Sequence, residues 1–565
     1  MAATVVTACS RTAPPPSPRS AAAEQDCRRK YGPSMWGDFF ITHEPCTQEE
    51  LVAMQKKAQV LMEEVRRIVM DAAAASGQLA AKLDLVDALQ RLGVVYHYKK
   101  EIDDLLRAVY DDVKDDASAS ADDDLYVTSL RFYLLRKQGY NVSSDVFAKF
   151  RDEQGNISSD DARTLMTLYD AAHMRVHGEG ILDDIIASTR PRLQALLMET
   201  DLEPALADEV RVTLEATRFR RVDRVEARRF ISVYEKKPVA ERDDTILEFA
   251  KLDYNLVQVV YCNELKELTI WWKDLRSRVD LTFSRDRLVE MHFWMMGMVY
   301  EAYYPYSRIM LTKLVLFIAL LDDIYDNYST TEESNIFTAA LERWDEKAAE
   351  QIPEYLRPLY TNVIRCTDQV VAELKQQNNQ HADAVREIVI DVAKSFHAEA
   401  TWRDERYVPA DVDEHLQISL GSIAGMQTLV LAFISLGDVT TREAIDWALT
   451  YPKIISALCV VGRILNDIMS HEREQASDHM ASTVQTCIKQ YGVTVEEAIE
   501  KLKVITDKAW MDMVEECLDQ KYPIALLQKV VSFGQSISFI YKSEDSYTLP
   551  SNLKATLTLL YAEFV

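Results

Sequence analysis

The chain has 565 residues, and because single hydrophobic cores stop growing at about 250–300 residues, we expect at least two domains. Apolar residues make up 48% of the sequence, which is ordinary for a globular protein. The net charge of −26 argues against nucleic acid and anionic membranes as partners, so an anionic ligand would need local cations, either metal ions or arginines.

The first 30 residues are predicted to be a disordered tail. Residues 1–23 contain Arg11 and Arg19 but no acidic residue, a composition that resembles a weak plastid transit peptide. The proline run at 14–16 and the short length of the segment favour a tail instead. The eight cysteines form no CxxC pair, which is typical of reduced thiols inside a cell. We therefore expect a cytoplasmic protein rather than a plastidial one.

From Glu49 onward the pattern predicts helices almost everywhere. Apolar residues recur with a period near 3.6, for example at Leu51, Met54, Leu61 and Val65, and no segment shows the alternation of a strand. The low counts of Gly and Pro, 15 and 16, disfavour a fold rich in tight hairpins. No apolar run approaches the roughly 18 residues that span a bilayer. These observations predict an all-α fold without a transmembrane segment.

The best candidate for a domain boundary is the charged stretch Lys236–Asp244, which contains Pro238. It predicts a helical N-terminal domain over residues 31–241 and a C-terminal helix bundle over residues 242–565. The first half carries no comparable group of functional residues. Its acidic tract at residues 122–124 lies in a predicted loop, so we assign it no catalytic role.

An apolar run over residues 314–321 leads straight into the sequence Asp322-Asp323-Ile324-Tyr325-Asp326. On a helix, Asp322 and Asp326 lie one turn apart on one face, with Asp323 about 100° further round. An acidic cluster is usually a solvated helix end. The preceding apolar run favours a position at the rim of a cavity instead.

A second set of oxygen-bearing side chains follows the apolar segment Ile454–Leu465. Asn466, Ser470 and Glu474 are four residues apart, so on a helix they form a stripe about 12 Å long. Such stripes are common on exposed helices. Mg²⁺, however, binds through a few protein oxygens together with substrate phosphates. Two facing stripes would hold several Mg²⁺ ions and clamp a diphosphate.

Three arginines are candidates for binding the phosphate groups. Arg463 lies about one turn before Asn466 on the same face, where it could pair with phosphate oxygens. Arg285 and Arg287 follow Ser284, a predicted helix N-cap. Side chains two residues apart point to different sides of a helix, so these two converge on one anion only if the segment is loop-like. The alternative is the first turn of a surface helix.

Other patterns leave two interpretations open or exclude a function. Gly421 and Gly425 interrupt a helical pattern, which indicates either close helix packing or a kink that frees carbonyls into a cavity. Most aromatic residues at helical spacing belong to a core. The sequence has no zinc-ligand spacing, no nucleotide-binding glycine motif and no G-x-S-x-G, so these kinds of site are not expected.

Taken together and in this order, the motifs resemble those of plant class I terpene synthases of the two-domain type, specifically sesquiterpene synthases. The resemblance covers about Pro33 to the C-terminus. It is carried by the N-terminal signature Pro33–Phe40, the first-domain segment Phe132–Arg136, the R-x-R motif Arg285–Arg287, the D-D-x-x-D motif Asp322–Asp326 and the N-S-E motif Asn466–Glu474.

The resemblance implies a non-catalytic N-terminal domain and a metal-binding catalytic domain. It implies three Mg²⁺ ions, for which Mn²⁺ could substitute, held by Asp322, Asp326, Asn466, Ser470 and Glu474. The diphosphate would be bound by Arg285, Arg463 and Arg287, next to Asp322, Asp326 and Asn466. Trp294, Tyr541 and Tyr547 would line the hydrocarbon pocket, where aromatic faces stabilise cations without acting as nucleophiles. Asp545 would lie in a lid-like C-terminal loop.

We therefore expect a monomeric lyase that ionises farnesyl diphosphate and cyclises the cation to a sesquiterpene. Three alternatives remain. A monoterpene synthase acting on geranyl diphosphate would carry eight residues between a tandem arginine and a tryptophan, and only six separate Arg29 from Trp36. A chain-elongating prenyltransferase would carry D-D-x-x-D twice. A non-catalytic scaffold would be expected to have lost one of the two metal motifs.

Overall fold

The computed structural model describes residues 32–75, 77–115, 124–153, 155–198, 202–475 and 481–565. The predicted tail at residues 1–30 lies outside these ranges, as do Asp122 and Asp123 of the acidic tract. Every regular element in the described part of the chain is a helix, which confirms the all-α prediction.

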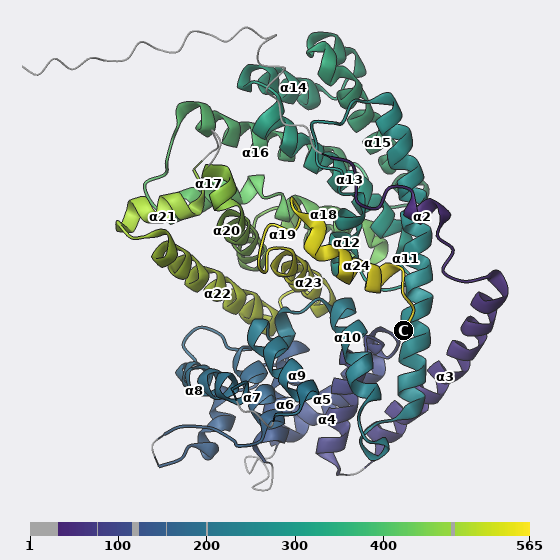
Figure 1. The fold of residues 1–565 in the computed structure, drawn as a ribbon, viewed down its shortest axis with the longest axis vertical. Coiled ribbons are helices and arrows are strands. Elements are labelled where there is room, and N and C mark those ends of the chain that lie inside the picture. The colour runs from purple at the N-terminus through teal and green to yellow at the C-terminus, as the bar shows by residue number, and fades with distance from the viewer. Residues whose placement is uncertain (1–31, 76, 116–123, 154, 199–201, 476–480) are drawn as a thin grey trace, which may run out of the picture.

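The helices of the first half form the lower body in Figure 1, apart from α2 and α3, which lie along the right-hand side. Side-chain caps set several of their starts: Thr47 and Glu50 form a capping box at α3, and Asp124 accepts from the backbone N–H of Val127 at α6. The helices are α2 (Phe39–Thr42), α3 (Gln48–Ala74), α4 (Leu79–Arg91), α5 (Lys99–Asp115), α6 (Leu125–Lys137), α7 (Ala162–Ala172), α8 (Gly180–Leu196), α9 (Pro204–Glu215) and α10 (Asp223–Glu235).

The second half begins with the 35-residue helix α11, which is capped by Asp243. The helices of the second half form the upper body in Figure 1. Its helices are α11 (Asp244–Arg278), α12 (Leu288–Met298), α13 (Pro305–Asp323), α14 (Thr331–Arg343), α15 (Arg357–Gln376), α16 (Ala384–Glu405), α17 (Val412–Ser422), α18 (Gly425–Ser435), α19 (Arg442–Ala448), α20 (Lys453–Gln475), α21 (Thr483–Tyr491), α22 (Val495–Asp519), α23 (Ile524–Ile540) and α24 (Leu553–Tyr561).

One continuous apolar core runs from Trp36 to Tyr561 and crosses the predicted boundary at residue 241. The segment around α2 packs against α11, well away from the lower body (Figure 1). There Trp36 donates from Nε1 to Glu290 at 3.3 Å, and the backbone N–H of Ser34 donates to Asp286 at 3.2 Å. The first residues of the described chain therefore lie on the helices of the second half. The domain limits stay a prediction.

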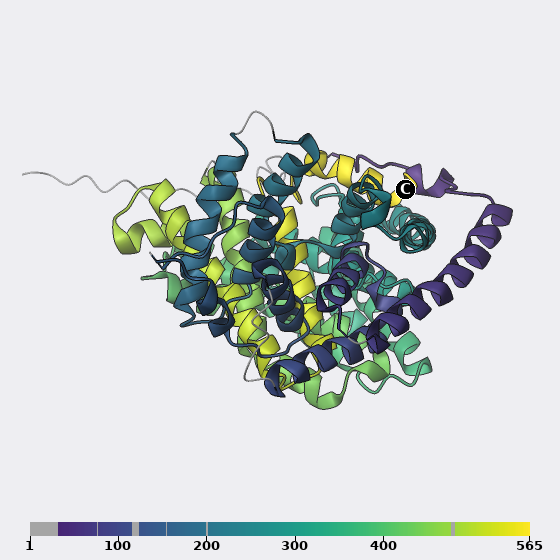
Figure 2. The ribbon, with the colours of Figure 1, turned by 90° about the horizontal axis from the view of Figure 1, so that it is seen from below.

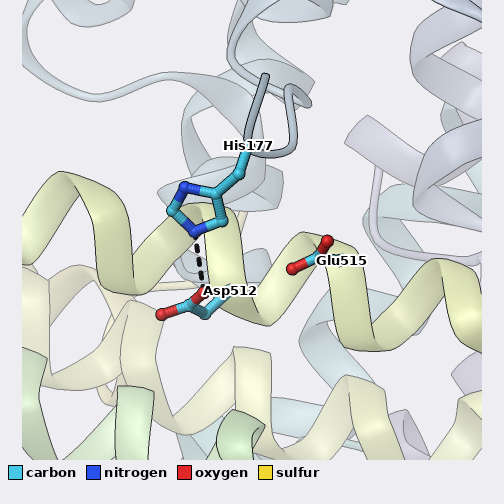
Figure 3. Close-up of side chains that lie close together, drawn as sticks. All are labelled: His177, Asp512 and Glu515. Atoms are coloured by element: carbon cyan, nitrogen blue, oxygen red, sulfur yellow. Dashed lines mark hydrogen bonds and ion pairs between the residues drawn. The ribbon is translucent and has the colours of Figure 1, made fainter. Parts of the chain in front are cut away.

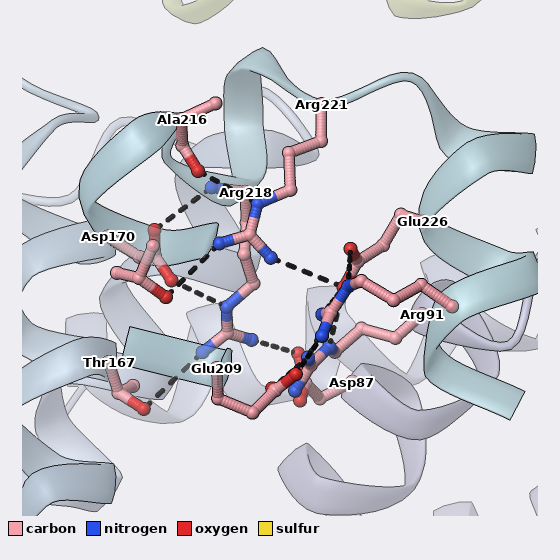
Figure 4. Close-up of polar contacts among 11 residues, drawn as sticks. Asp87, Arg91, Thr167, Asp170, Glu209, Ala216, Arg218, Arg221 and Glu226 are labelled. Carbon is pink, nitrogen blue, oxygen red and sulfur yellow. Dashed lines mark hydrogen bonds and ion pairs between the residues drawn. The ribbon is translucent and has the colours of Figure 1, made fainter. Parts of the chain in front are cut away.

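A buried polar network joins the helices of the lower body (Figure 4). Arg218 pairs with Asp170 at 2.7 Å and with Asp87, while Arg91 and Arg221 both contact Glu226. Although burial raises the pKa of Glu226, the surrounding guanidinium groups hold it below its usual value. The charges in this network are matched within the protein, so it serves as structural cross-linking.

Ion pairs also join the lower body to α22 (Figure 2 shows the whole chain from below). His177 lies 2.8 Å from Asp512, beside Glu515 (Figure 3). A histidine with two carboxylates can hold a metal ion. Here, however, the Lys453 ammonium group pairs with Asp512 at 2.9 Å and also with Glu515. An ammonium group therefore already balances the charge at this contact.

Two helical segments are long and apolar enough to cross a membrane by length and mean hydropathy alone, Val412–Ser435 and Lys453–Gln475. The expectation from the sequence rested on unbroken apolar runs and missed them. The segments are 72% and 67% buried inside the protein, and the first is interrupted between α17 and α18. Both belong to the walls of the cavity described next.

Candidate active site

A cavity of about 180 Å³ lies among the helices of the second half, between α12, α13, α16, α20 and α23. Its apolar walls come from Met291, Trp294, Met295, Val315, Ile318, Phe396, Ile423, Phe533, Ile537, Tyr541 and Tyr547. Its charged and amide side chains come mainly from the C-terminal ends of α13 and α20, together with Arg285 before α12. The two predicted stripes of oxygen-bearing side chains are therefore brought to one cavity.

The first stripe spans the end of α13 and the turn that follows. Asp322 belongs to the last turn of α13, whereas Asp326 lies in a π-helical turn, Ile324–Tyr328. Arg403 of α16 donates to the backbone carbonyls of Tyr325, at 2.8 Å, and Asp326. Both carboxylates line the cavity, although the helix that carries them is not the regular α-helix that the spacing predicted.

Asp323 also bonds the loop before α12. Its carboxylate accepts from the Ser284 hydroxyl and, at 3.2 Å, from the backbone N–H of Arg285. Ser284 is therefore not the N-cap that the sequence predicted, and α12 begins later, at Leu288. Asp323 fixes the loop that carries Arg285, which agrees with its expected place on another side of the helix.

The charge on Asp322 is poorly compensated by the protein. Burial, together with the negative charge of Asp326, raises its pKa to about 8, although Arg285 opposes this effect from 2.9 Å. Burial likewise raises the pKa of Glu399, a carboxylate of α16 in the same cavity. Such a group of carboxylate oxygens fits a hard divalent cation.

The second stripe lies on α20, as the spacing predicted. Asn466 and Glu474 line the cavity, and Asn466 donates to the hydroxyl of Tyr541 at 3.1 Å. Ser470 lies between them on α20 but does not line the cavity, and its hydroxyl oxygen is buried without a hydrogen-bond partner in the described part of the chain. Buried polar atoms are almost always satisfied. An orphaned hydroxyl in this position fits a ligand for a metal ion.

Arg285 and Arg463 both reach the cavity. Arg285 contacts Asp322 and Asp323, each at 2.9 Å. Arg463 donates to the Ser422 hydroxyl at 2.9 Å and lies 3.3 Å from Glu399. One guanidinium therefore pairs with aspartates of α13 and the other with a glutamate of α16.

Arg287 is not brought to the cavity. Its guanidinium donates to the carbonyl oxygens of Tyr547 at 2.7 Å and of Thr548 at 2.8 Å. The segment from Arg285 to Arg287 precedes α12 and is loop-like, so the two side chains are free to diverge. Arg287 therefore contacts the C-terminal segment, and its contact with a diphosphate stays a prediction.

The aromatic residues predicted for the pocket do meet there. The indole of Trp294 stacks on the ring of Tyr547, with centroids 5.2 Å apart, and lies 6.2 Å from the ring of Tyr541. All three line the cavity. Asp545 does not: its carboxylate is buried and pairs with Arg473 at 2.7 Å.

The helix interruption at Gly421–Gly425 combines close packing with a break in the helix. Helix α17 ends at Ser422 and α18 begins at Gly425, with Ala424 in a left-handed conformation at φ 53°. A β-carbon at Gly425 would lie only 2.9 Å from the sulfur of Cys459, so close packing also requires glycine. Ser422, Ile423 and Ala424 line the cavity at the break.

Three cavity or supporting residues were missed by the sequence analysis: Glu399, Arg403 and Arg473. Asp467 accepts from the backbone N–H of Thr483 at 2.6 Å and fixes the start of α21. Arg473 was within reach of prediction because it adjoins Glu474 of the second stripe. Glu399 and Arg403 lie on another helix, and no spacing in the sequence links them to the motifs.

Comparisons with known proteins agree with this arrangement. Residues 35–214 match the family model described as the terpene synthase N-terminal domain, and residues 273–512 match that of the terpene synthase metal-binding domain. The chain is 48% identical to (E)-beta-caryophyllene synthase from Zea mays over 96% of its own length and 97% of the relative's. It is 42% identical to beta-sesquiphellandrene synthase from Sorghum bicolor over 95% and 96%.

Among solved structures, isoprene synthase from grey poplar (Populus x canescens) in complex with three Mg²⁺ ions and dimethylallyl-S-thiolodiphosphate is similar, with a TM-score of 0.81. The two proteins are 27% identical, and the match covers 94% of this chain and 99% of the other.

Proposed function

The chain belongs to the terpene synthase family, and we propose that it acts as a sesquiterpene synthase on farnesyl diphosphate. Enzymes of this family are carbon–oxygen lyases that act on prenyl diphosphates. The two relatives compared over almost the full length are both named for sesquiterpene products. One observation carries the proposal: a single cavity combines oxygen-bearing side chains and arginines with apolar, aromatic walls.

Divalent metal ions are expected at the carboxylate-rich part of the cavity. We assign Asp322 and Asp326 on one wall and Asn466, Ser470 and Glu474 on the other as their ligands. We propose three Mg²⁺ ions, the number in the isoprene synthase complex, with Mn²⁺ as a substitute. When bound, such ions neutralise the negative charge that develops on a leaving diphosphate.

The protein's own cations complete the binding of the leaving group. Arg285 and Arg463 both line the cavity, and guanidinium groups form strong charge-assisted hydrogen bonds with phosphate oxygens. As the allylic carbon–oxygen bond breaks, both electrons leave with the diphosphate. Preorganised donors stabilise this charge more effectively than water, which must reorient.

The remaining walls then receive the carbocation. Trp294 and Tyr547 offer ring faces, which attract a cation without forming a bond to it. The aliphatic side chains around them carry no nucleophile, so the cation can cyclise before it loses a proton. Excluding bulk water from this space prevents early capture of the cation.

The test is a product assay with the purified protein, Mg²⁺ and C10, C15 and C20 prenyl diphosphates, with volatile products identified by mass spectrometry. We expect cyclic C15 products from farnesyl diphosphate, and none with Asp326→Ala or after chelation of the metal. Preferential turnover of geranyl diphosphate would support a monoterpene synthase, and no product from any substrate would support the scaffold alternative. The monomeric state and the cytoplasmic location are further proposals, tested by light scattering and by imaging a fluorescent fusion of the full chain.

A further inference from the structure

Arg473 occupies a position between the second stripe and the C-terminal segment of the cavity. It lies on α20 directly before Glu474 and lines the cavity. Its guanidinium pairs with Asp545 at 2.7 Å. Asp545 belongs to the irregular segment 541–549, which links α23 to α24 and carries Tyr547.

Segment 541–549 contains no α-helix, so side chains determine its position. From the side of α12, Arg287 donates to the carbonyls of Tyr547 and Thr548, and Arg285 donates to the Thr548 hydroxyl at 3.2 Å. Asp545 also accepts from the backbone N–H of Thr548 at 3.0 Å, which closes a local turn.

From the side of α20 the same segment is held by a hydrogen bond and an ion pair. One is the hydrogen bond between Asn466 and Tyr541 at 3.1 Å, and the other is the ion pair between Arg473 and Asp545. Asn466 is itself an assigned metal ligand. Its amide oxygen would bind the metal ion, while its amide nitrogen donates to Tyr541. The ion pair is the charged attachment between the helix of the second stripe and the segment over the cavity.

The burial of the two partners is unequal. The side chain of Asp545 is 4% exposed, whereas that of Arg473 is 31% exposed. Removing one partner of a buried ion pair leaves an uncompensated buried charge, which is strongly unfavourable. Without Arg473, the Asp545 carboxylate regains hydration most readily if the segment moves away from the cavity and admits water.

We propose that Arg473 is a positioning residue that keeps segment 541–549 closed over the cavity through Asp545 and so excludes water from the carbocation. This inference rests on the proposed function. If water enters, its oxygen forms a bond to the cationic carbon and one of its protons passes to solvent, which gives an alcohol. If water is excluded, a carbon-bound proton is lost and the product is a hydrocarbon.

The test compares Arg473→Met with the wild type in water enriched in ¹⁸O, with farnesyl diphosphate and Mg²⁺. We expect the ¹⁸O-labelled alcohol fraction of the products to rise roughly tenfold, since a buried charge is left without a partner. Total diphosphate release should stay within about threefold, because Arg473 is not assigned to the leaving group. Arg442→Met, which removes an exposed arginine paired with Asp446 on α19, is the matched control and should leave both quantities unchanged.

The double variant Arg473→Met/Asp545→Asn separates pairing from a general effect on folding. Removing the buried charge as well should bring the alcohol fraction back toward that of Asp545→Asn alone. An unchanged alcohol fraction in Arg473→Met, or purely additive effects in the double variant, would overturn the inference. Absence of diphosphate release from farnesyl diphosphate in the wild type would instead overturn the proposed function.

Discussion

Arg403 holds the backbone of Asp326 through a hydrogen bond from its guanidinium to the Asp326 carbonyl. The same nitrogen donates to the carbonyl of Tyr325 at 2.8 Å. These carbonyls belong to a π-helical turn, where the regular helical hydrogen bonds of α13 have ended. Helix α16 therefore fixes the orientation of a carboxylate that belongs to a different helix.

We expect Arg403→Leu to raise the Mg²⁺ concentration needed for half-maximal activity by about tenfold. Two buried carbonyls would lose a charged donor, and an unsatisfied buried acceptor costs about 1–3 kcal/mol, so the turn would no longer hold Asp326 in place. The measurement is a Mg²⁺ titration of diphosphate release. Lys394 also lies on α16, and Lys394→Met, which removes an exposed ion pair with Glu342 of α14, should leave the titration unchanged. A normal titration for Arg403→Leu would show that the turn positions itself without Arg403.

Alanine substitutions of the three aspartates around the turn should differ in their effects on turnover and thermal stability. Asp322→Ala and Asp326→Ala should remove nearly all turnover while the circular dichroism stays helical, because each loses an assigned metal ligand. Asp323→Ala should instead keep measurable turnover and lower the thermal midpoint, because its carboxylate bonds Ser284 and the backbone of Arg285. Near wild-type turnover in Asp326→Ala would contradict the assignment of the first stripe.

Glu474→Gln tests the second stripe without changing the size of the side chain. The substitution removes one negative charge, so a higher Mg²⁺ concentration should be required before activity is lost at all concentrations. Glu472→Gln is a matched control two residues earlier, on an exposed position of α20. If the two variants give the same titration as the wild type, Glu474 is not a metal ligand.

The sequence was most informative where a periodic pattern and a change of polarity coincide. Apolar segments ending in Asp322 and in Asn466 predicted two helices and the cavity to which both contribute. The π-helical turn after Asp323 was not predictable, because it depends on Arg403, which is 77 residues from Asp326. Arg287 likewise satisfied a motif, but its contacts depend on where the distant carbonyls of residues 547 and 548 lie. Contacts between segments far apart in the sequence produce no local pattern of residue spacing from which they could be predicted.

Trp294 tests whether the pocket aromatics act on the cation or only fill space. Its indole stacks on Tyr547, whose ring also lies 4.8 Å from the guanidinium carbon of Arg285. The attraction of a cation to an indole face is about 2 kcal/mol or more when desolvated. Since about 1.4 kcal/mol corresponds to a tenfold change in rate, this is enough to decide which of several competing cations survives.

Trp294→Leu should therefore keep diphosphate release within about threefold, because the leaving group is bound at the carboxylate-rich part of the cavity. The product distribution should shift toward acyclic or early-quenched hydrocarbons, measured by mass spectrometry of the volatile fraction. Trp294→Phe keeps a ring with a weaker attraction for cations and should give an intermediate distribution. If Trp294→Leu yields the unaltered wild-type profile, the indole contributes only packing, and the stabilisation of the cation must come from Tyr541, Tyr547 or the cavity as a whole.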